Sequence, residues 1–224
     1  IYRLFYTTTG IFTTPIDVCS KYIAVFIIFG AFLERTGIAD FFIQIANAFV
    51  GGFSGGPAKV AVVASAMEGM VSGSSVANTV GSGSVTIPLM KKTGYKPEFA
   101  AAAEASASTG GQIMPPILGA AAFLMADYVQ IPYSQIALKA ILPAVLYFAG
   151  IFIAVHLEAK KMGLRGLTKE ELPAFLPLLK KIYLLTPLVL LIYLVGTSTK
   201  SIQYAAALAI LAAIFVSMFS KETR

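Results

Sequence analysis

Long apolar blocks alternate with short polar stretches along the chain. A helix that crosses a bilayer needs roughly 20 predominantly apolar residues. By this measure and by hydrophobic periodicity, the pattern predicts helices over Ile16–Leu33, Ile38–Val50, Phe99–Tyr128, Tyr133–Leu157, Pro177–Val195 and Gln203–Phe219. The second of these is short and amphipathic, and the third is interrupted. The sequence therefore predicts an all-α membrane protein built as a multi-span helical bundle.

Composition supports a chain that lies in lipid. Of the 224 residues, 57% are hydrophobic and 12% are charged, and the mean hydropathy is +0.79. Soluble domains carry about 25% charged residues. We therefore expect the bilayer to be the main partner of this chain.

Two stretches of small polar residues interrupt the apolar pattern. They read SGSSVANTVGSGS over Ser72–Ser84 and SASTGGQIMPP over Ser106–Pro116. Gly, Ser and Pro at this density break helices, and hydrocarbon cannot satisfy the backbone N–H and C=O groups that a break frees. Such breaks persist at membrane depth where they line a cavity or a binding site, as in secondary transporters. The two stretches therefore predict a substrate or ion site near the middle of the membrane.

The region from Pro57 to Met90 differs from a single membrane span. Its apolar arms, Ala58–Val71 and Val85–Met90, are each too short to cross a bilayer alone. We interpret the region as a re-entrant helical hairpin whose Ser/Gly tip lies at membrane depth. The alternative is one ordinary span with a glycine-rich packing face.

These features divide the chain into three expected regions. Residues 1–56 hold a membrane helix and the amphipathic segment, residues 57–132 hold the hairpin and the interrupted helix, and residues 133–224 hold the C-terminal helices with a cytoplasmic loop at 158–176. Loops rich in Lys and Arg stay in the cytoplasm. The basic residues that set this orientation are Lys91, Lys92, Lys96, Lys160, Lys161, Arg165 and Lys169.

The net charge of +6 is explained by this topology. The sequence has no patch that interleaves basic and aromatic residues, so we expect no nucleic-acid partner. The single Cys19 and single His156 exclude a disulfide framework and a zinc site made of several Cys and His residues. No cofactor is expected.

Two other functional classes remain as alternatives. The run Gly52–Gly56 matches the G-x-S-x-G pattern of serine hydrolases, with Ser54 as nucleophile and His156 as the one available base, which would make the chain an intramembrane serine protease. That pattern needs a strand–turn–helix setting, which an all-helical chain lacks, so we do not expect an enzyme. A channel or scaffold subunit without carrier activity is the other alternative, because a hairpin repeated in an oligomer can line a pore.

Three runs carry a resemblance to a known family. They are GGPAKVAVVASAMEGMVSGSSVAN at Gly55–Asn78, TIPLMKKTGYKPEFAAAAEASASTGGQIMPPILGAAAFLMA at Thr86–Ala126, and HLEAKKMGLRGL at His156–Leu167. Together they resemble the large membrane subunit of tripartite ATP-independent periplasmic (TRAP) transporters, in the fused-permease branch whose soluble partners are of the TAXI type. The resemblance covers Tyr2 to Pro173, and STGGQIMPP at Ser108–Pro116 is its most specific part.

The resemblance implies half of an elevator-type, inverted-repeat transporter. Such a permease uses a sodium gradient to import small organic anions, mainly carboxylates, which a periplasmic binding protein delivers. It would be a multi-pass protein of a bacterial or archaeal cytoplasmic (inner) membrane. In the family, each of two inverted repeats supplies one hairpin and one broken helix. This chain shows the first repeat, so the remaining half of the permease is a further expected partner.

Sodium, as a hard cation, prefers oxygen ligands. No Asp or Glu lies between Glu68 and Lys91, which favours a monovalent over a divalent ion at the hairpin. The predicted sodium ligands are the carbonyl and side-chain oxygens of Ser72, Ser74, Ser75, Asn78, Ser108, Thr109 and Gly110.

Substrate-binding residues are expected at two places. One is the start of the second hairpin helix, at Gly83 and Ser84, where free N–H groups favour a substrate carboxylate. The other is the second break at Gly111, Gln112 and Pro115, where proline bars a regular helix and leaves backbone carbonyls free for a ligand. A simple proline kink is the alternative there.

Two acids lie close to the breaks in sequence. Glu104 precedes the second break, and it is either buried for a functional reason or placed near the cytoplasmic entrance beside Lys91 or Lys96. Glu68 has the same two interpretations. Neither acid is a predicted ligand.

Overall fold

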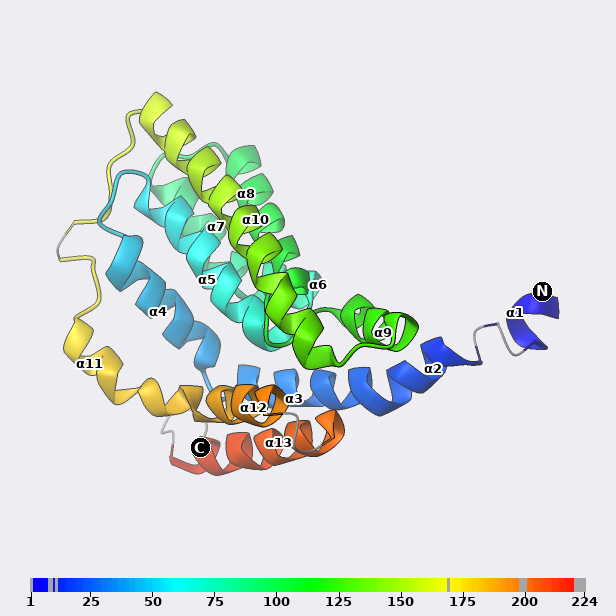
Figure 1. Ribbon diagram of the computed structural model, residues 1–224. Coiled ribbons are helices and arrows are strands. Elements are labelled where there is room, and N and C mark those ends of the chain that lie inside the picture. Colours follow the sequence, from blue (N-terminus) through cyan, green and yellow to red (C-terminus); the bar gives the residue numbers. More distant parts are fainter. Residues whose placement is uncertain (1, 8–9, 11, 169, 198–200, 220–224) are drawn as a thin grey trace.

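The computed structural model describes residues 2–7, 10, 12–168, 170–197 and 201–219. Every regular element in these ranges is a helix, which confirms the predicted all-α class (Figure 1). Within the described residues, two helices are long and apolar enough to cross a membrane, Thr14–Arg35 and Tyr133–Lys161. Shorter apolar helices cover Ile38–Val50, Ala120–Val129, Ile182–Gly196 and Ile202–Met218.

The first long helix is built from consecutive pieces. After the short α1 (Tyr2–Phe5), α2 (Thr14–Val18) continues through a π-helical turn, η1 (Cys19–Ile23), into α3 (Ala24–Arg35). The chain then turns at Gly37, which has a φ of 78° that glycine adopts without strain. The next helix, α4 (Ile38–Val50), matches the predicted amphipathic segment.

The hairpin is present, and its tip is shorter than predicted. Its first arm is α5 (Gly56–Ser72), and its second arm is α6 (Ser75–Gly81) followed by α7 (Gly83–Lys92). The reversal takes place at Gly73, with a φ of 57°, and Ser74 caps α6 by accepting a hydrogen bond from the N–H of Ala77 at 3.3 Å. The prediction that the second arm starts at Val85 is therefore wrong, because this N-cap restarts the helix directly after the turn.

The interrupted helix is confirmed. Helix α8 (Pro97–Thr109) passes into a 3-10 turn, η2 (Gly110–Ile113), and α9 (Ala120–Val129) begins after an irregular segment at 114–119. Ser106, Ser108 and Thr109 still belong to α8, so the break begins at Gly110. The break lies here because Gly110 and Gly111 have low helix propensity and because Pro115 and Pro116 cannot continue a regular helix.

The C-terminal part begins with α10 (Tyr133–Lys161), which confirms the predicted long helix. It continues through α11 (Phe175–Lys180) and the 3-10 turn η3 (Ile182–Leu185) to α12 (Thr186–Gly196) and α13 (Ile202–Phe219). The predicted span Pro177–Val195 is therefore divided, and its regular part begins at Thr186. Pro187 occupies the first turn of α12, a position that suits a residue without an N–H group.

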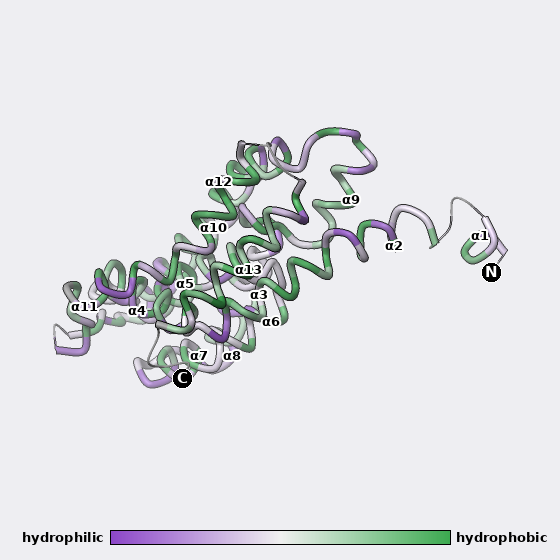
Figure 2. The backbone as a smooth tube through the Cα atoms, turned by 90° about the horizontal axis from the view of Figure 1, so that it is seen from below, coloured by the Kyte–Doolittle hydropathy of each residue, from purple (hydrophilic) through white to green (hydrophobic). Residues whose placement is uncertain are grey.

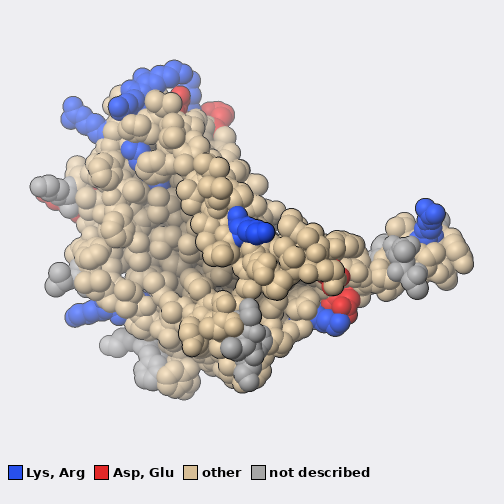
Figure 3. Space-filling model, viewed as in Figure 1, with Lys and Arg blue, Asp and Glu red and all other residues tan. Residues whose placement is uncertain are grey.

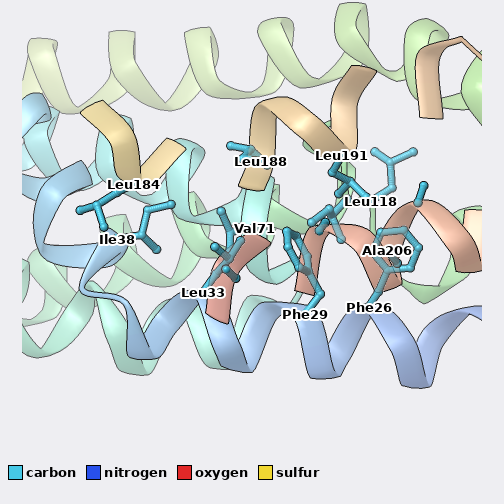
Figure 4. Close-up of a cluster of buried hydrophobic side chains, with 14 of the residues drawn as sticks. Phe26, Phe29, Leu33, Ile38, Val71, Leu118, Leu184, Leu188, Leu191 and Ala206 are labelled. Carbon is cyan, nitrogen blue, oxygen red and sulfur yellow. The ribbon is translucent and has the colours of Figure 1, made fainter. Parts of the chain in front are cut away.

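Two hydrophobic clusters organise the helices. The larger one joins α3 to α12 and α13 through side chains such as Phe29, Leu33 and Leu191 (Figure 4). The second joins α5, α8 and α10 through Ala58, Ala103 and Val155. The larger cluster also contains Val71 of the hairpin, Leu118 of the second break and Tyr133 of α10, so it packs the hairpin and the broken helix against α3, α12 and α13.

The surface separates apolar flanks from charged ends. Hydrophobic colour dominates the helices and hydrophilic colour gathers mainly at turns and helix ends (Figure 2). Several large apolar side chains of α10 are exposed, for example Leu138 at 70% and Leu146 at 64%. Lys and Arg cluster at the end of the molecule where α10 finishes and α7 turns into α8 (Figure 3). This distribution fits a bilayer around the flanks and the predicted basic cytoplasmic loops.

Candidate functional site

The two breaks in the helices face each other across a cavity. The cavity has a volume of about 420 Å³, and the hairpin tip, the second break and α3 line it. The contributing residues are Ile23, Phe26, Ile27, Ser72, Gly73, Ser74, Gln112, Ile113, Ile117, Leu118, Gly119, Ala120, Ala121 and Phe123. The side-chain amide of Gln112 donates to the Ser75 hydroxyl at 2.9 Å, so one hydrogen bond ties the second break to the tip.

The irregular backbone of the second break is held from two sides. The N–H of Gly119 donates to the carbonyl of Gln112 at 2.7 Å. The Tyr133 hydroxyl accepts from the N–H of Leu118 at 3.1 Å and donates to the carbonyl of Pro116 at 2.9 Å. One tyrosine of α10 thus satisfies two backbone groups that the break frees, as buried polar groups require.

The hairpin and the second break touch through glycines. A side chain on Gly69 of α5 would collide with the α-carbon of Gly111. A Cβ on Gly111 would lie 3.0 Å from the α-carbon of Gly69 and 3.1 Å from Nδ2 of Asn78. Only a pair of residues without side chains allows this approach of the two backbones.

The predicted sodium ligands fall into three groups. Ser72 and Ser74 line the cavity between the breaks, and Ser75 adjoins it through its bond to Gln112. Asn78 is buried and lines a neighbouring cavity. The third group is not on the cavity: the Ser108 hydroxyl donates to Glu104, that of Thr109 donates to the carbonyl of Ala105, and Gly110 packs against Tyr147 and Phe148.

The predicted substrate residues are also divided. Gln112 lines the cavity and Gly111 lies behind it against Gly69. Pro115 lies instead in a depression beside α10 and α12. Gly83 and Ser84 lie inside the second arm, where Ser84 is exposed and donates to the carbonyl of Gly81 at 2.8 Å. Helix α7 does begin at Gly83, directly after α6, and neither Gly83 nor Ser84 lines the cavity between the breaks.

A buried cluster of hydroxyl groups surrounds Glu104, and the sequence did not predict it. Glu104 is 0% exposed. Its Oε1 accepts hydrogen bonds from Ser65 at 3.0 Å, from Ser108 at 3.0 Å and from Ser82, and its Oε2 accepts one from Thr86 at 2.5 Å. Donors from α5, the junction of α6 with α7, α7 itself and α8 thus converge on one carboxyl group. The alternative in which Glu104 pairs with Lys91 or Lys96 is therefore wrong.

Glu68 and Asn78 lie beside this cluster and keep oxygen atoms without hydrogen-bond partners. Asn78 donates from Nδ2 to the carbonyl of Ser65 at 2.9 Å, while its Oδ1 has no partner in the described structure. Glu68 is 7% exposed, and its Oε1 also lacks one. Buried acceptors without donors are rare in folded proteins, and each calls for a physical explanation.

The protease pattern has no supporting geometry. The Ser54 hydroxyl donates to the carbonyl of Leu164 at 2.9 Å. Among the described residues, no hydrogen bond joins Ser54 to His156. The segment is a turn that leads into α5, without the strand that a nucleophile elbow requires.

Comparisons with known proteins agree on one family. The profile described as "Tripartite ATP-independent periplasmic transporter, DctM component" matches residues 6–224. The C4-dicarboxylate TRAP transporter large permease protein DctM of Vibrio cholerae is 36% identical over 135 residues, which are 60% of this chain and 29% of that protein. The protein of the same name from Pseudomonas aeruginosa is 28% identical over 197 residues, 87% of this chain and 45% of its own length.

A relative named for a different substrate is also similar. The sialic acid TRAP transporter large permease protein SiaM of Vibrio cholerae is 24% identical over 168 residues, which are 74% of this chain and 39% of that protein. The chain therefore spans less than half the length of these curated relatives.

Proposed function

Because the chain belongs to the DctM-component family of tripartite ATP-independent periplasmic transporters, we propose that it forms part of a membrane permease that imports small organic anions. Three of the relatives are named for C4-dicarboxylates or for sialic acid, which carry carboxylates, and another is named for isethionate, a sulfonate. The proposed substrate is therefore a small carboxylate, delivered by a periplasmic binding protein and driven by sodium. The proposed location is the cytoplasmic membrane of a bacterium or archaeon.

The observation that carries this proposal is the meeting of the two breaks. Backbone outside regular helices is tolerated at membrane depth where it lines a cavity. Here the hairpin tip and the second break line one cavity of about 420 Å³ and are joined by the hydrogen bond between Gln112 and Ser75. Discontinuous helices that meet in this way form the ion and substrate sites of secondary transporters.

We assign the sodium role first to the residues at this cavity. Ser72 and Ser74 line it, and Ser75 lies against Gln112. Their hydroxyl and carbonyl oxygens are neutral ligands suited to a hard monovalent cation. Gln112 is the proposed contact for the substrate, because its side-chain amide can donate to a carboxylate. A substrate that accepts a hydrogen bond from Gln112 would break the hydrogen bond between Gln112 and Ser75. Substrate binding would thereby affect the sodium ligand Ser75.

The proposed movement is that of an elevator-type transporter. One hydrophobic cluster joins α5, α8 and α10, and the larger cluster packs Val71 of the hairpin and Leu118 of the second break against α3, α12 and α13. We propose that the hairpin, α8 and α10 travel as a unit and slide against α3, α12 and α13 along the contacts of the larger cluster. The remaining half of the permease would complete the moving unit and the site.

Sodium-driven uptake tests this function. The permease that carries this sequence is reconstituted in proteoliposomes with its binding protein and a labelled four-carbon dicarboxylate, under an inward sodium gradient or a matched choline gradient. Sodium should stimulate uptake. Ser75→Ala should raise the half-saturating sodium concentration by about tenfold, the effect of losing roughly 1.4 kcal/mol of binding.

The control is Ser106→Ala, an exposed serine one turn before the second break, which should behave like the wild type. Equal uptake in sodium and in choline would overturn the sodium-driven mechanism. An unchanged sodium requirement in Ser75→Ala would remove the cavity from that mechanism.

A further inference from the structure

A buried lysine lies where α5 begins beside the last turns of α10 (Figure 1). Lys59, in the first turn of α5, is 4% exposed. Its Nζ lies 5.7 Å from the ring centre of Phe53 and 5.4 Å from that of Phe152 on α10. Aromatic rings attract a cation, but they carry no net charge. The two rings therefore hold the ammonium group without neutralising it.

No acid balances Lys59 in the part of the chain that the structure describes. Neither of the ion pairs found there involves it. Glu158, the one acidic residue of α10, pairs instead with Lys161 at 3.7 Å. The charge that acts on Lys59 is that of Lys160, which is also positive. The positive end of the α5 dipole opposes a cation in the first turn as well. Burial of such a charge is costly, so the arrangement favours a bound anion.

His156 adds a second nitrogen group to this region. Phe152, His156 and Lys160 follow each other at intervals of four residues and so lie on one face of α10. The Nδ1 atom of His156 is buried and has no hydrogen-bond partner in the described structure. The charged side chains that act on the imidazole are Lys59 and Lys160. Three side chains that can donate hydrogen bonds to an anion therefore gather here without an acid of their own.

The apolar side chains beside these three residues are exposed. Phe53 is 61% exposed, and Ile153 and Leu157 of α10 are 57% and 59% exposed. A free phosphate ion would contact the nitrogen groups and leave these side chains uncovered. A phospholipid would contact both, because its head carries the phosphate and its acyl chains can cover the apolar flank of α10.

We propose that Lys59, His156 and Lys160 bind the phosphate group of an anionic phospholipid in the cytoplasmic leaflet. Basic sites between membrane helices on the cytoplasmic side bind lipid head groups of this kind. The inference rests on the proposed orientation, in which the basic end of the molecule is cytoplasmic (Figure 3). Since Lys59 belongs to α5 and the other two residues belong to α10, the lipid would join the first hairpin arm to α10.

Thermal unfolding with added lipid tests the proposal. The purified permease that carries this sequence, in detergent micelles, is titrated with dioleoyl phosphatidylglycerol, with dioleoyl phosphatidylcholine or with inorganic phosphate. Only phosphatidylglycerol, the anionic lipid, should raise the unfolding midpoint. Lys59→Met keeps an unbranched side chain between the two rings and removes the charge, so its half-saturating concentration of phosphatidylglycerol should rise by about tenfold or more. His156→Leu should raise it by about threefold.

A matched control is Lys92→Gln at the end of α7, which removes an exposed positive charge and should respond to phosphatidylglycerol like the wild type. In phosphatidylcholine, Lys59→Met should be as stable as the wild type or more stable, because the unbalanced charge is gone. A lower midpoint there would overturn the site, since Lys59 would then stabilise the fold without an anion. An unchanged response of Lys59→Met or His156→Leu would overturn it too. Equal stabilisation by inorganic phosphate or by phosphatidylcholine would overturn the assignment to an anionic lipid.

The lipid titration separates this inference from the proposed function, because it does not depend on uptake. If sodium drives uptake while Lys59→Met responds to phosphatidylglycerol like the wild type, the function stands and this site fails. If uptake is equal in sodium and choline while Lys59→Met loses its response to phosphatidylglycerol, the site stands and the sodium-driven function fails.

Discussion

At the scale of single residues, the Glu104 side chain connects several helices. Hydroxyl groups from Ser65, Ser82, Thr86 and Ser108 are all directed at its two oxygens. Hydrogen bonds to a charged acceptor contribute about 1.5–3 kcal/mol each. The donors come from both hairpin arms and from the broken helix, so the carboxyl group fixes the hairpin on α8.

Truncation of Glu104 should therefore destabilise the hairpin. Glu104→Ala leaves four buried hydroxyl groups without their shared acceptor, and we expect the free energy of unfolding to fall by on the order of 3 kcal/mol. Glu104→Gln should lose less, because Ser82 and Thr86 have second acceptors in the carbonyls of Asn78 at 2.8 Å and Ser82 at 3.0 Å. Their hydroxyl oxygens are then free to accept from the new amide.

Chemical unfolding in detergent micelles measures this difference. The exposed Glu98 provides the control, since Glu98→Gln should lie within about 0.5 kcal/mol of the wild type. Equal stability of Glu104→Ala and wild type would contradict the role assigned to the cluster.

The sequence indicated which kinds of side chain occur in this region, but it did not indicate which of them contact each other. Ser, Thr and Gly at the breaks were recognisable, but the partners of Glu104 lie up to 39 residues away along the chain. Only the packing of the two arms onto α8 brings them together. The same packing decides that Ser108 binds Glu104 and not the cavity. A buried carboxyl group cannot be distinguished from an exposed one by spacing alone when its partners lie on other helices.

The contact between Gly69 and Gly111 defines the arrangement at the scale of elements. It lets the backbone of α5 lie directly against the second break. Helix packing in membranes often uses small residues for such close approach. The distance between hairpin and broken helix is therefore set by two glycines as well as by Glu104.

Gly69→Ala should force the hairpin away from the second break. Its Cβ would collide with backbone, which cannot move aside as a flexible side chain can. We expect a lower unfolding temperature and a large loss of sodium-driven uptake. Gly150→Ala is the matched control, because nothing lies within 4 Å of the added Cβ on α10. That variant should be as stable as wild type or more so, given the better helix propensity of alanine.

Differential scanning fluorimetry and uptake on the same preparations give both readouts. If Gly69→Ala and Gly150→Ala behave alike, the close approach of the two elements is not required.

The sequence predicted which helices exist, but it predicted the residues at which they begin and end less accurately. Apolar length predicted the hairpin arms and the long α10, since burial in lipid depends on composition. The hairpin tip was predicted over Ser72–Ser84, yet only Ser72–Ser74 reverses the chain, because Ser74 caps α6. Local capping chemistry thus outweighed the low helix propensity of the Ser and Gly residues that follow.

At the scale of the whole molecule, the proposed function has the hairpin unit move against α3, α12 and α13. The cavity between the breaks is lined by both parts, since α3 contributes Phe26 and Ile27 and the preceding turn η1 contributes Ile23. The proposed movement would therefore open or close this cavity. Such opening and closing would distinguish a carrier from a channel, which keeps a continuous path.

Counterflow separates these two mechanisms. Proteoliposomes loaded with unlabelled substrate should accumulate labelled substrate transiently, and the exchange rate should saturate as substrate concentration rises. The control is the same vesicle without internal substrate. A flux that rises without saturation would support the channel alternative.

Access to the cavity between the breaks tests the central claim most directly. Ala121→Cys places a thiol on the cavity lining, in a Cys19→Ala background that removes the single native cysteine. Val145→Cys, on the exposed apolar flank of α10, is the lipid-facing control. The account predicts that a membrane-impermeant maleimide labels Ala121→Cys but not Val145→Cys, and that sodium slows this labelling relative to choline. Equal labelling rates in sodium and choline, or no labelling of Ala121→Cys, would contradict it.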